Sequence, residues 1–376
     1  MSLPAPALEP GATIGILGSG QLARMLALAA AQLGFQCHIF APDRDSPAFD
    51  VVRKSTRADY VDQQALAHFA EHVDVVTYEF ENIPAETATL LASLVPVLPD
   101  PKVLATTQDR IAEKDFVAAL GIGTTAYAAV SMPAELAAAI ERIGRPAVLK
   151  TRRFGYDGKG QATITKDGTL ESAWQSVGGK PSILEAFVPF AREVSVVAAR
   201  AADGTVECFD VTQNEHRDHI LKVSRVPAAV SDETARKARR IAESIAHRFG
   251  YIGVLAVEMF VLADGAVLVN EIAPRVHNSG HWTIEACIVS QFENHIRAVA
   301  GWPLGSTERH SDAVMENLIG EQAANFKALA AKGGGLHLYG KSEARKGRKM
   351  GHLTALGATP EEALAKVLAA REALAR

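Results

Sequence analysis

A glycine-rich segment that directly follows a predicted buried strand constrains this chain more than any other feature of its sequence. The apolar run that begins at Pro146 ends at Lys150, and the loop after it contains Gly155, Gly158 and Gly160. Glycine lets backbone N–H groups approach an anion without steric cost, and nearby cations add positive charge. The pattern predicts a phosphate-binding lid carried by strands, although its spacing is not that of the P-loop.

Two acidic residues lie on successive apolar segments downstream of this lid. Glu258 stands in a segment that otherwise has the pattern of a core strand, and Glu271 follows Asn270 near the end of the next segment. A buried carboxylate without a partner would be unfavourable, and Mg²⁺, which prefers oxygen ligands, is the expected compensation. A structural ion pair with arginine is the alternative explanation. The lid and the two acids together indicate an enzyme that uses ATP.

The N-terminal part of the chain alternates predicted strands and helices, which indicates a doubly wound parallel lobe. Its first turn, Gly18-Ser19-Gly20, is a near match to the dinucleotide-binding fingerprint, and Asp43 stands where a ribose-binding acid would be expected. By itself this turn favours an NAD-dependent dehydrogenase as much as any other enzyme. The lid and the paired acids favour an ATP-using enzyme instead, because a dehydrogenase needs neither.

Five motifs that follow one another along almost the whole chain resemble those of one enzyme family. They are Gly18-Ser-Gly-Gln-Leu-Ala-Arg-Met25, Thr77-Tyr-Glu-Phe-Glu-Asn82, Gly155-Tyr-Asp-Gly-Lys-Gly-Gln161, Asn270-Glu-Ile-Ala-Pro-Arg-Val-His-Asn-Ser-Gly-His281, and Tyr339-Gly-Lys341 with Gly347-Arg-Lys-Met-Gly-His352. Together they are similar to the motifs of the N5-carboxyaminoimidazole ribonucleotide synthases, which belong to the ATP-grasp superfamily. The resemblance implies an ATP-grasp architecture of the α/β and α+β classes, with an N-terminal doubly wound parallel lobe, an ATP-lid lobe and a C-terminal lobe.

The strand and helix patterns, read with this resemblance, predict four parts of the chain. They are a proline-rich disordered tail at 1–11, an N-terminal parallel α/β domain at 12–108, an ATP-grasp domain at 109–305 with its lid subdomain at about 122–188, and a C-terminal domain at 306–376 that packs on the ATP-grasp core. Asp109 is predicted to cap a helix that runs to Leu120 and enters the second part.

The resemblance implies an ATP site built from cations, a lid, a hinge and acids. Arg110 and Lys150 are expected around the phosphates, and Glu258 and Glu271 are expected to bind two Mg²⁺ ions. The other residues implied for ATP are the lid residues Gly155, Tyr156, Asp157, Gly158, Lys159, Gly160 and Gln161, the adenine-reading hinge Glu185, Ala186, Phe187 and Val188, the ribose acid Glu193, and His216, Asn270 and Glu271.

The same resemblance implies a ribonucleotide site in the first lobe. Ser19, Gln21 and Glu79 are expected to face 5-aminoimidazole ribonucleotide, and Glu79 also comes just past a predicted strand end, where open α/β sheets bind ligands. The motifs leave the role of Glu81 open. Lys341 and Arg348 correspond to cations that hold the 5′-phosphate, although composition alone would favour a basic surface loop. Tyr156 and Asp157 of the lid are also implied as substrate contacts.

Three residues after a predicted strand end complete the implied catalytic set with Lys150. Arg275, His277 and Asn278 offer hydrogen-bonding side chains suited to a planar anion, and an arginine fork matches bicarbonate or carboxyphosphate. The implied reaction is ATP- and bicarbonate-dependent carboxylation of the exocyclic amine of the ribonucleotide, through carboxyphosphate, in purine biosynthesis. Another ATP-grasp ligase, such as a formate-dependent glycinamide ribonucleotide transformylase or a biotin carboxylase, is the first alternative, and a dehydrogenase is the second.

Composition sets limits on partners and location. The net charge of −4 gives no general attraction to nucleic acid or membranes, and no segment approaches the length of an apolar membrane span. The cysteines Cys37, Cys208 and Cys287 stand far apart without the spacing of a metal site, which is typical of a reduced, cytoplasmic protein. We expect a cytoplasmic homodimer with ATP, bicarbonate and 5-aminoimidazole ribonucleotide as its small-molecule partners.

Overall fold

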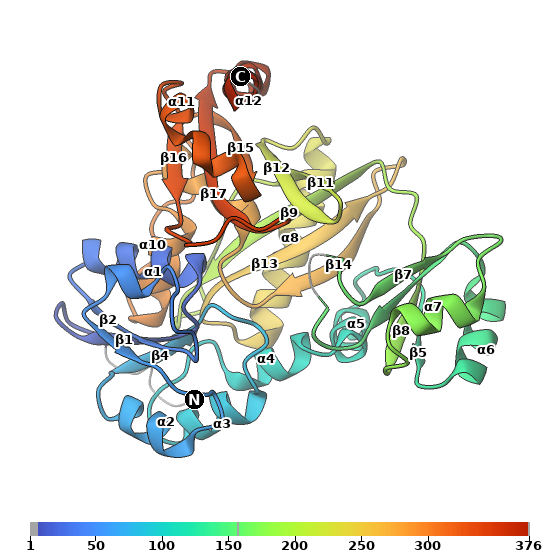
Figure 1. Ribbon diagram of the computed structural model, residues 1–376, viewed down its shortest axis with the longest axis horizontal. Helices are drawn as coiled ribbons and strands as arrows, with labels where there is room; N and C mark the ends of the chain where they lie inside the picture. The colour runs from blue at the N-terminus through green and yellow to red at the C-terminus, as the bar shows by residue number, and fades with distance from the viewer. Residues whose placement is uncertain (1–6, 156–157, 375–376) are drawn as a thin grey trace.

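The computed structural model describes residues 7–155 and 158–374, which form three β-sheets with helices packed against them (Figure 1). Two predicted site residues, Tyr156 and Asp157, lie outside the described residues. The expected class is confirmed, because a parallel lobe at the N-terminus is joined to two sheets with antiparallel pairing. Just before the first strand, Leu8 exchanges hydrogen bonds with Ala300 and Trp302. The sequence did not indicate this anchor.

The N-terminal lobe is a four-stranded parallel sheet in the order β3-β2-β1-β4. The strands are apolar because helices cover the sheet, so that Ile14 and Ile16 are fully buried. The order reverses between β1 and β4, which brings the loops after Leu17 and Tyr78 side by side. The elements are β1 (Thr13–Leu17), α1 (Gln21–Gln32), β2 (Gln36–Phe40), η1 (Phe49–Val51), β3 (Lys54–Thr56), α2 (Gln63–Ala70), β4 (Val75–Tyr78), α3 (Ala85–Ala92) and α4 (Pro101–Thr107).

The lid lobe is a four-stranded antiparallel sheet in the order β5-β8-β6-β7, drawn in green in Figure 1. Leu149 and Leu184 pair across its two central strands and pack with Leu136 of a covering helix. The hairpin between β6 and β7 carries the glycine-rich loop, as predicted. The elements are β5 (Tyr127–Val130), α6 (Pro133–Ile143), β6 (Ala147–Thr151), β7 (Gln161–Ile164), α7 (Leu170–Ser176) and β8 (Ser182–Ala186).

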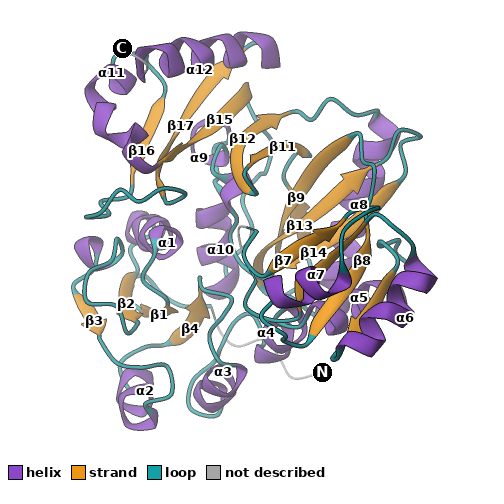
Figure 2. Cartoon of the chain, turned by 45° about the vertical axis from the view of Figure 1, so that its right-hand side comes forward, coloured by secondary structure: helices purple, strands orange, loops and turns teal. Residues whose placement is uncertain are grey.

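The largest sheet has nine strands in the order β14-β13-β9-β11-β12-β15-β17-β16, with β10 paired to β9 (Figure 2). The strands from the first part of the sheet are β9 (Arg192–Arg200), β10 (Val206–Cys208), β11 (Thr212–Arg217), β12 (Ile220–Val226), β13 (Gly253–Val261) and β14 (Val267–Ala273). The C-terminal strands β15 (Asp312–Ile319), β16 (Gly335–Leu338) and β17 (Lys349–Gly357) continue the same sheet. The C-terminal part therefore joins the ATP-grasp core by hydrogen-bonded pairing of β12 with β15, in addition to packing.

Helices cover this sheet and lead into the site. Asp109 caps α5 (Arg110–Ala119), since its side chain accepts hydrogen bonds from the N–H groups of Ile111 and Ala112, as predicted. Ser231 caps the long amphipathic α8 (Asp232–Phe249). The remaining elements are η2 (Asn278–Gly280), α9 (Thr283–Ala286), α10 (Gln291–Val299), η3 (Gly320–Asn325), α11 (Phe326–Ala330) and α12 (Pro360–Leu374).

Candidate active site

The two predicted metal-binding acids lie opposite each other on one face of the large sheet. Glu258 of β13 and Glu271 of β14 are register partners, and the pairing then shifts so that Asn270 has no partner in β13. Asn270 is thus the extra residue of a β-bulge, a feature that re-aims side chains. Its Oδ1 is buried and is not hydrogen-bonded to any described residue. Three oxygen donors therefore gather around one bulge.

Helix α5 holds this bulge with two buried ionisable residues. The Nζ of Lys114 donates to the carbonyl oxygen of Asn270 over 3.0 Å, and Glu113 accepts a hydrogen bond from the N–H of Ile272 over 2.7 Å. Burial, with the charge of Glu271, raises the pKa of Glu113 to about 8. Sequence reasoning missed both residues. The available signal was an adjacent acid–base pair on a helix whose first turn carries Arg110.

The acids of the bulge already have cationic partners. Arg110 lies 3.0 Å from Glu271 and also donates to the carbonyl oxygen of Gly155 in the lid, so it joins the two lobes. The Nε2 of His277 lies 3.0 Å from Glu258. Burial alone would raise the pKa of Glu258, but the hydrogen bond from His277 and the neighbouring positive charges lower it to about 2. The alternative of a structural ion pair with arginine therefore applies to Glu271 in this ligand-free geometry, whereas Glu258 contacts a histidine.

Lys150 projects from β6 toward the hinge strand β8. Its Nζ donates to Glu185 over 2.6 Å, and the other oxygen of Glu185 lies 3.6 Å from Lys114. Burial favours the protonated form of Glu185, but the charges of Lys150 and Lys114 lower its pKa to about 2. Glu185 thus links the lid cation to the helix that supports the bulge. In the hinge, the N–H groups of Ala186 and Phe187 are already hydrogen-bonded to Ala126 and Pro146.

The lid loop is shaped by two glycines with positive φ. Gly158 and Gly160 have φ of +76° and +69°, and a Cβ at Gly160 would lie 2.7 Å from the hydroxyl of Thr151. A Cβ at Gly158 would lie 2.5 Å from the side chain of His219. Gln161 is hydrogen-bonded to the same His219 over 3.2 Å, and Lys159 is exposed. The loop therefore needs glycine at both positions to lie against β6 and the turn before β12.

The predicted ribose acid and phosphate histidine lie together on β9 and β11. The Nδ1 of His216 lies 2.5 Å from Glu193, because Glu193 pairs with Asn214 across these strands. Burial opposes a charge on His216, but Glu193 and Glu258 raise its pKa. His216 thus contacts the predicted ribose acid and is also influenced by the charge of Glu258, a predicted metal-binding acid.

The segment after β14 joins the ATP-binding sheet to the N-terminal lobe. Arg275 lies 2.8 Å from Glu81, so Glu81, whose role the motifs left open, is a site residue that holds the arginine. The other side of His277 is fixed, since its Nδ1 is hydrogen-bonded to Ser279 over 2.8 Å. Asn278 is buried, and its amide is paired reciprocally with that of Asn317. The geometry gives Asn278 a positioning role, in contrast to the predicted contact with the anion.

Glu79 is buried in the N-terminal lobe at the switch point, the place where the strand order reverses between β1 and β4. It accepts a hydrogen bond from the N–H of Gly20 over 2.8 Å, and a Cβ at Gly18 would lie 2.6 Å from its carboxylate. Burial raises the pKa of Glu79, against the opposing effect of Gly20 and of the cations Arg275 and Lys341. The hydroxyl of Ser19 donates to Asp43 over 2.8 Å, while Gln21, the first residue of α1, is half-buried.

The basic loop between β16 and β17 reaches the same lobe. A Cβ at Gly340 would lie 3.2 Å from the carboxylate of Asp50, which shows that the start of the loop touches η1, between β2 and β3. Lys341 donates to the carbonyl oxygen of Lys349, and Arg348 donates to that of Glu343. The sequence from Gly335 to Ser342 has the spacing of a P-loop, Gly-x4-Gly-Lys-Ser. However, residues 335–338 form strand β16, and no helix follows within the described loop. This match therefore has no P-loop structure.

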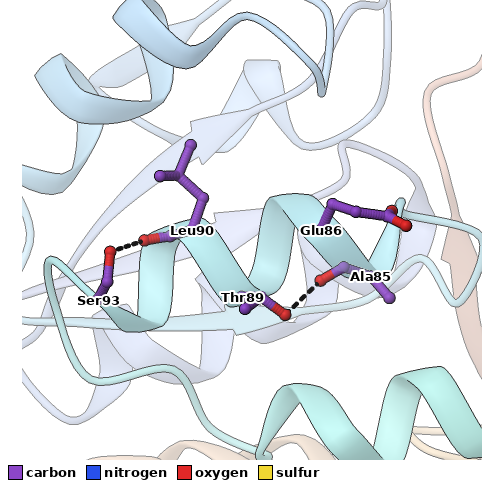
Figure 3. Close-up of a pocket in the computed structure, with 5 residues that line it drawn as sticks. All are labelled: Ala85, Glu86, Thr89, Leu90 and Ser93. Carbon is purple, nitrogen blue, oxygen red and sulfur yellow. Dashed lines mark hydrogen bonds between the residues drawn. The ribbon is translucent and has the colours of Figure 1, made fainter.

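One surface depression lies away from these residues, on the outer face of α3 (Figure 3). The side-chain hydrogen bonds there run within the helix, from Thr89 to the carbonyl oxygen of Ala85 and from Ser93 to that of Leu90. A single helix face with no converging polar groups offers no chemistry. No helix in the described part of the chain is long and apolar enough to cross a membrane.

Comparison with known proteins identifies the family to which this chain belongs. Family models match three consecutive regions: a ribonucleotide synthetase preATP-grasp domain at residues 11–108, an ATP-grasp domain at 115–292, and a phosphoribosylaminoimidazole carboxylase C-terminal domain at 313–366. The fold and the site define an ATP-grasp enzyme. The N5-carboxyaminoimidazole ribonucleotide synthase of Brucella melitensis is 52% identical over 92% of this chain and 97% of that protein. The chain belongs to the N5-carboxyaminoimidazole ribonucleotide synthase family.

Solved structures agree with this assignment. An N5-carboxyaminoimidazole ribonucleotide synthetase in complex with ADP is 40% identical, with a TM-score of 0.94 and coverage of 97% of each chain. The N5-carboxyaminoimidazole synthase of Aspergillus clavatus, in complex with ADP and 5-aminoimidazole ribonucleotide, is 30% identical, with a TM-score of 0.90 over 98% of this chain and 99% of that one. The expected family and the ATP-dependent ligase class are confirmed, and the dehydrogenase alternative is excluded.

Proposed function

We propose that the chain carboxylates the exocyclic amine of 5-aminoimidazole ribonucleotide where β14 meets the N-terminal lobe. The activity of an N5-carboxyaminoimidazole ribonucleotide synthase, an ATP-dependent ligase of purine biosynthesis, follows from its family. The observation that carries the location is the ion pair between Arg275 and Glu81. It brings the end of the ATP-binding strands against the switch point that contains Glu79, so an activated carboxylate and a nucleotide amine can meet there.

The first step forms carboxyphosphate. An oxygen of bicarbonate attacks the γ-phosphorus of ATP, the bond to the β,γ-bridging oxygen breaks, and ADP leaves with that electron pair. Lys150 and Arg110 neutralise phosphate charge, and Arg275 orients the planar anion through its guanidinium fork. Each of these cations now contacts a carboxylate, so substrate oxygens would exchange with carboxylates that are already in place.

The second step forms the C–N bond. The exocyclic amine attacks the carbonyl carbon of carboxyphosphate, or CO₂ released from it, and phosphate leaves with the electrons of the broken bond. The proton lost by the amine can pass to the leaving phosphate. Glu79 would accept hydrogen bonds from the ribonucleotide, and the lid at 155–161 would exclude the water that destroys carboxyphosphate.

Magnesium fits the residues of the bulge. Glu258, Glu271 and the unpartnered Oδ1 of Asn270 are hard oxygen donors on one face, which is the ligand set that Mg²⁺ prefers. When bound with ATP, Mg²⁺ would supply neutralising charge to the β- and γ-phosphates. His277 and Arg110 contact the two carboxylates and hold them in place beforehand. We also expect the chain to act as a homodimer in the cytoplasm.

The experiment is ADP release by the purified chain with Mg-ATP and bicarbonate, measured with and without 5-aminoimidazole ribonucleotide. We expect release to rise strongly with the ribonucleotide and to match the acid-labile N-carboxy product one to one. Parallel reactions contain formate with glycinamide ribonucleotide, or biotin. Turnover only in one of those reactions would reject the proposed substrates in favour of a sister ligase.

A further inference from the structure

A second cluster of metal-binding side chains lies where the ATP-grasp part meets the C-terminal part. Glu285 belongs to α9, and His337 and His352 are direct register partners on β16 and β17. One ligand atom from each of the three lies within 4.8 Å of the other two. The two imidazole rings are stacked, with centroids 4.6 Å apart and an angle of 10° between their planes.

Several polar atoms of this cluster are buried without partners among the described residues. They are Oε2 of Glu285, Nε2 of His352, and Nε2 of the adjacent His281, whose ring lies 4.8 Å from that of His352. An unsatisfied buried polar atom is unfavourable, so three such atoms on neighbouring side chains favour a bound ion or water. His281 and His352 are fully buried, and a neutral imidazole is the form that binds metal.

The surroundings already contain the supporting contacts of a metal site. The hydroxyl of Tyr339 lies 2.8 Å from Nδ1 of His352, and a proton donated from Nδ1 to this oxygen would leave the Nε2 lone pair for a metal. Gly335 leaves room for the acid, since a Cβ there would lie 2.4 Å from the side chain of Glu285. The side chains of His337 and Glu285 remain 33% and 16% exposed, which gives an ion an entry path.

We propose that Glu285, His337 and His352 bind one divalent transition-metal ion of the zinc class, with His281 as a further donor beside it. Mixed imidazole and carboxylate ligands suit Zn²⁺, whereas Mg²⁺ prefers oxygen ligands. Nε2 of His337 now lies 2.5 Å from Glu285, and the ion would displace the proton shared by that pair. Tetrahedral Zn²⁺ holds its donors about 3.3 Å apart, so the side chains would shift by roughly an ångström from their present spacing.

The proposed ion would be structural, because it would tie α9 to the two strands that enter the basic loop. β16 leads into Lys341 and β17 follows Arg348, so the ion would sit at the base of that loop. On the other side, Gln291 contacts both His281, over 3.3 Å, and the carbonyl oxygen of His277, over 2.6 Å. The site therefore lies one layer behind the active-site segment and does not depend on the reaction assigned to it.

The test measures Zn²⁺ binding to the full chain, stripped with a chelator, by competition with a chromophoric chelator in excess Mg²⁺. Excess Mg²⁺ occupies the oxygen sites and leaves imidazole sites to zinc. We expect one tightly bound Zn²⁺ per chain, a higher unfolding temperature with Zn²⁺, and affinity at least about 100-fold weaker in Glu285→Gln and His337→Gln.

The matched control is the exposed trio His68, Glu71 and His72, at the C-terminal end of α2 and just beyond it, whose atoms have similar spacing. The double variant His68→Gln/His72→Gln should keep the tight site. The proposal is overturned if the unaltered chain binds no zinc, if this double variant abolishes binding, or if Glu285→Gln and His337→Gln bind normally. Should either variant fail to fold, the visible absorption of Co²⁺ bound to the unaltered chain decides, because an octahedral, all-oxygen spectrum rejects the site.

Discussion

At the scale of single residues, three acids of the candidate site already contact basic side chains before any ligand arrives. Glu258 contacts His277, Glu271 contacts Arg110, and Glu185 contacts Lys150. These pairs avoid buried, uncompensated charge in the ligand-free chain. A ligand therefore exchanges partners with residues that are already charged and oriented, and substitutions should separate their roles in metal binding from their roles in stability.

Glu271→Gln should raise the Mg²⁺ concentration needed for half-maximal activity by about tenfold or more, since a neutral amide is a weaker partner for a hard cation. Glu258→Gln should act in the same direction but less strongly. Magnesium titrations of ADP release test this, with the exposed lid residue Glu171→Gln as the control. Titration curves that overlay that of the unaltered chain would show that these acids do not bind the metal.

Glu185→Gln should change how stability depends on pH. The pKa of Glu185 is lowered from 4.5, its value in the unfolded chain, to about 2 in the folded chain. The ionised carboxylate therefore stabilises the fold above pH 4.5, and this stabilisation is lost as the pH falls toward 2. At neutral pH the variant leaves Lys114 and Lys150 without their acid, which should cost about 3–5 kcal/mol.

Urea unfolding from pH 7 down to pH 3 measures this effect. The difference in unfolding free energy between the variant and the unaltered chain should narrow below pH 4.5. Glu362→Gln, which removes an exposed pair with Lys366, should change little at any pH. A difference that stays constant with pH would mean that Glu185 is not ionised in the folded chain.

At the scale of elements, two local irregularities shape the site. The bulge of β14 is clamped by Lys114 and Glu113 of α5, and the hairpin between β6 and β7 turns through glycines with positive φ. Bulges and glycine turns place side chains where a regular ladder could not. The geometry of the lid should therefore respond to a single added methyl group.

Gly160→Ala should loosen the coupling of the two reaction steps. The new Cβ would lie 2.7 Å from the hydroxyl of Thr151 at the base of the lid, which prevents the loop from closing fully. We expect several times more ADP released per carboxylated product, because carboxyphosphate would then meet water. The ratio of ADP to product measures this.

The matched control is Gly178→Ala in the same lobe. Its φ of +68° imposes a similar backbone strain, but the nearest atom to the new Cβ is 3.8 Å away. The interpretation fails if both variants uncouple the reaction equally, since backbone strain alone would then explain the result.

At the scale of the whole molecule, the C-terminal part is a continuation of the ATP-grasp sheet that returns to the N-terminal lobe. β15 extends the sheet from β12, and the loop after β16 touches η1 at Asp50. In Figure 1 the C-terminal elements, in red, stand above the blue N-terminal lobe. Residues far apart in sequence can therefore act on one nucleotide.

Lys341→Ala and Arg348→Ala should raise the KM for 5-aminoimidazole ribonucleotide about tenfold, at roughly 1–3 kcal/mol for each charge-assisted contact. The 5′-phosphate does not react, so the KM for ATP should barely change. Steady-state kinetics with each substrate varied in turn test this, and Arg345→Ala in the same loop, where Arg345 is exposed and paired with Glu343, is the control. An equal loss of ATP affinity would assign the loop to the ATP site.

Much of this molecule could be predicted from its sequence because the signals are local. The strands of the first lobe, the cap at Asp109 and the glycine loop each depend on neighbouring residues. The clamp by Glu113 and Lys114 could not be predicted, because it joins positions more than 150 residues apart and depends on a register shift in β14. The hydrogen bonds between the amides of Asn278 and Asn317 could not be predicted either, because they depend on the tertiary structure and not on a local pattern.

The pairing between β12 and β15 limits how the C-terminal part could be exchanged between related chains. Val223 through Val226 pair in register with residues 313–316, so a fusion point near residue 306 would have to restore a full strand-to-strand ladder. Domain exchange between relatives at this point would expose two unpaired edges, and bare edges attract other chains. The C-terminal part and the ATP-grasp part thus form one continuous sheet, even though family models describe the two as separate modules.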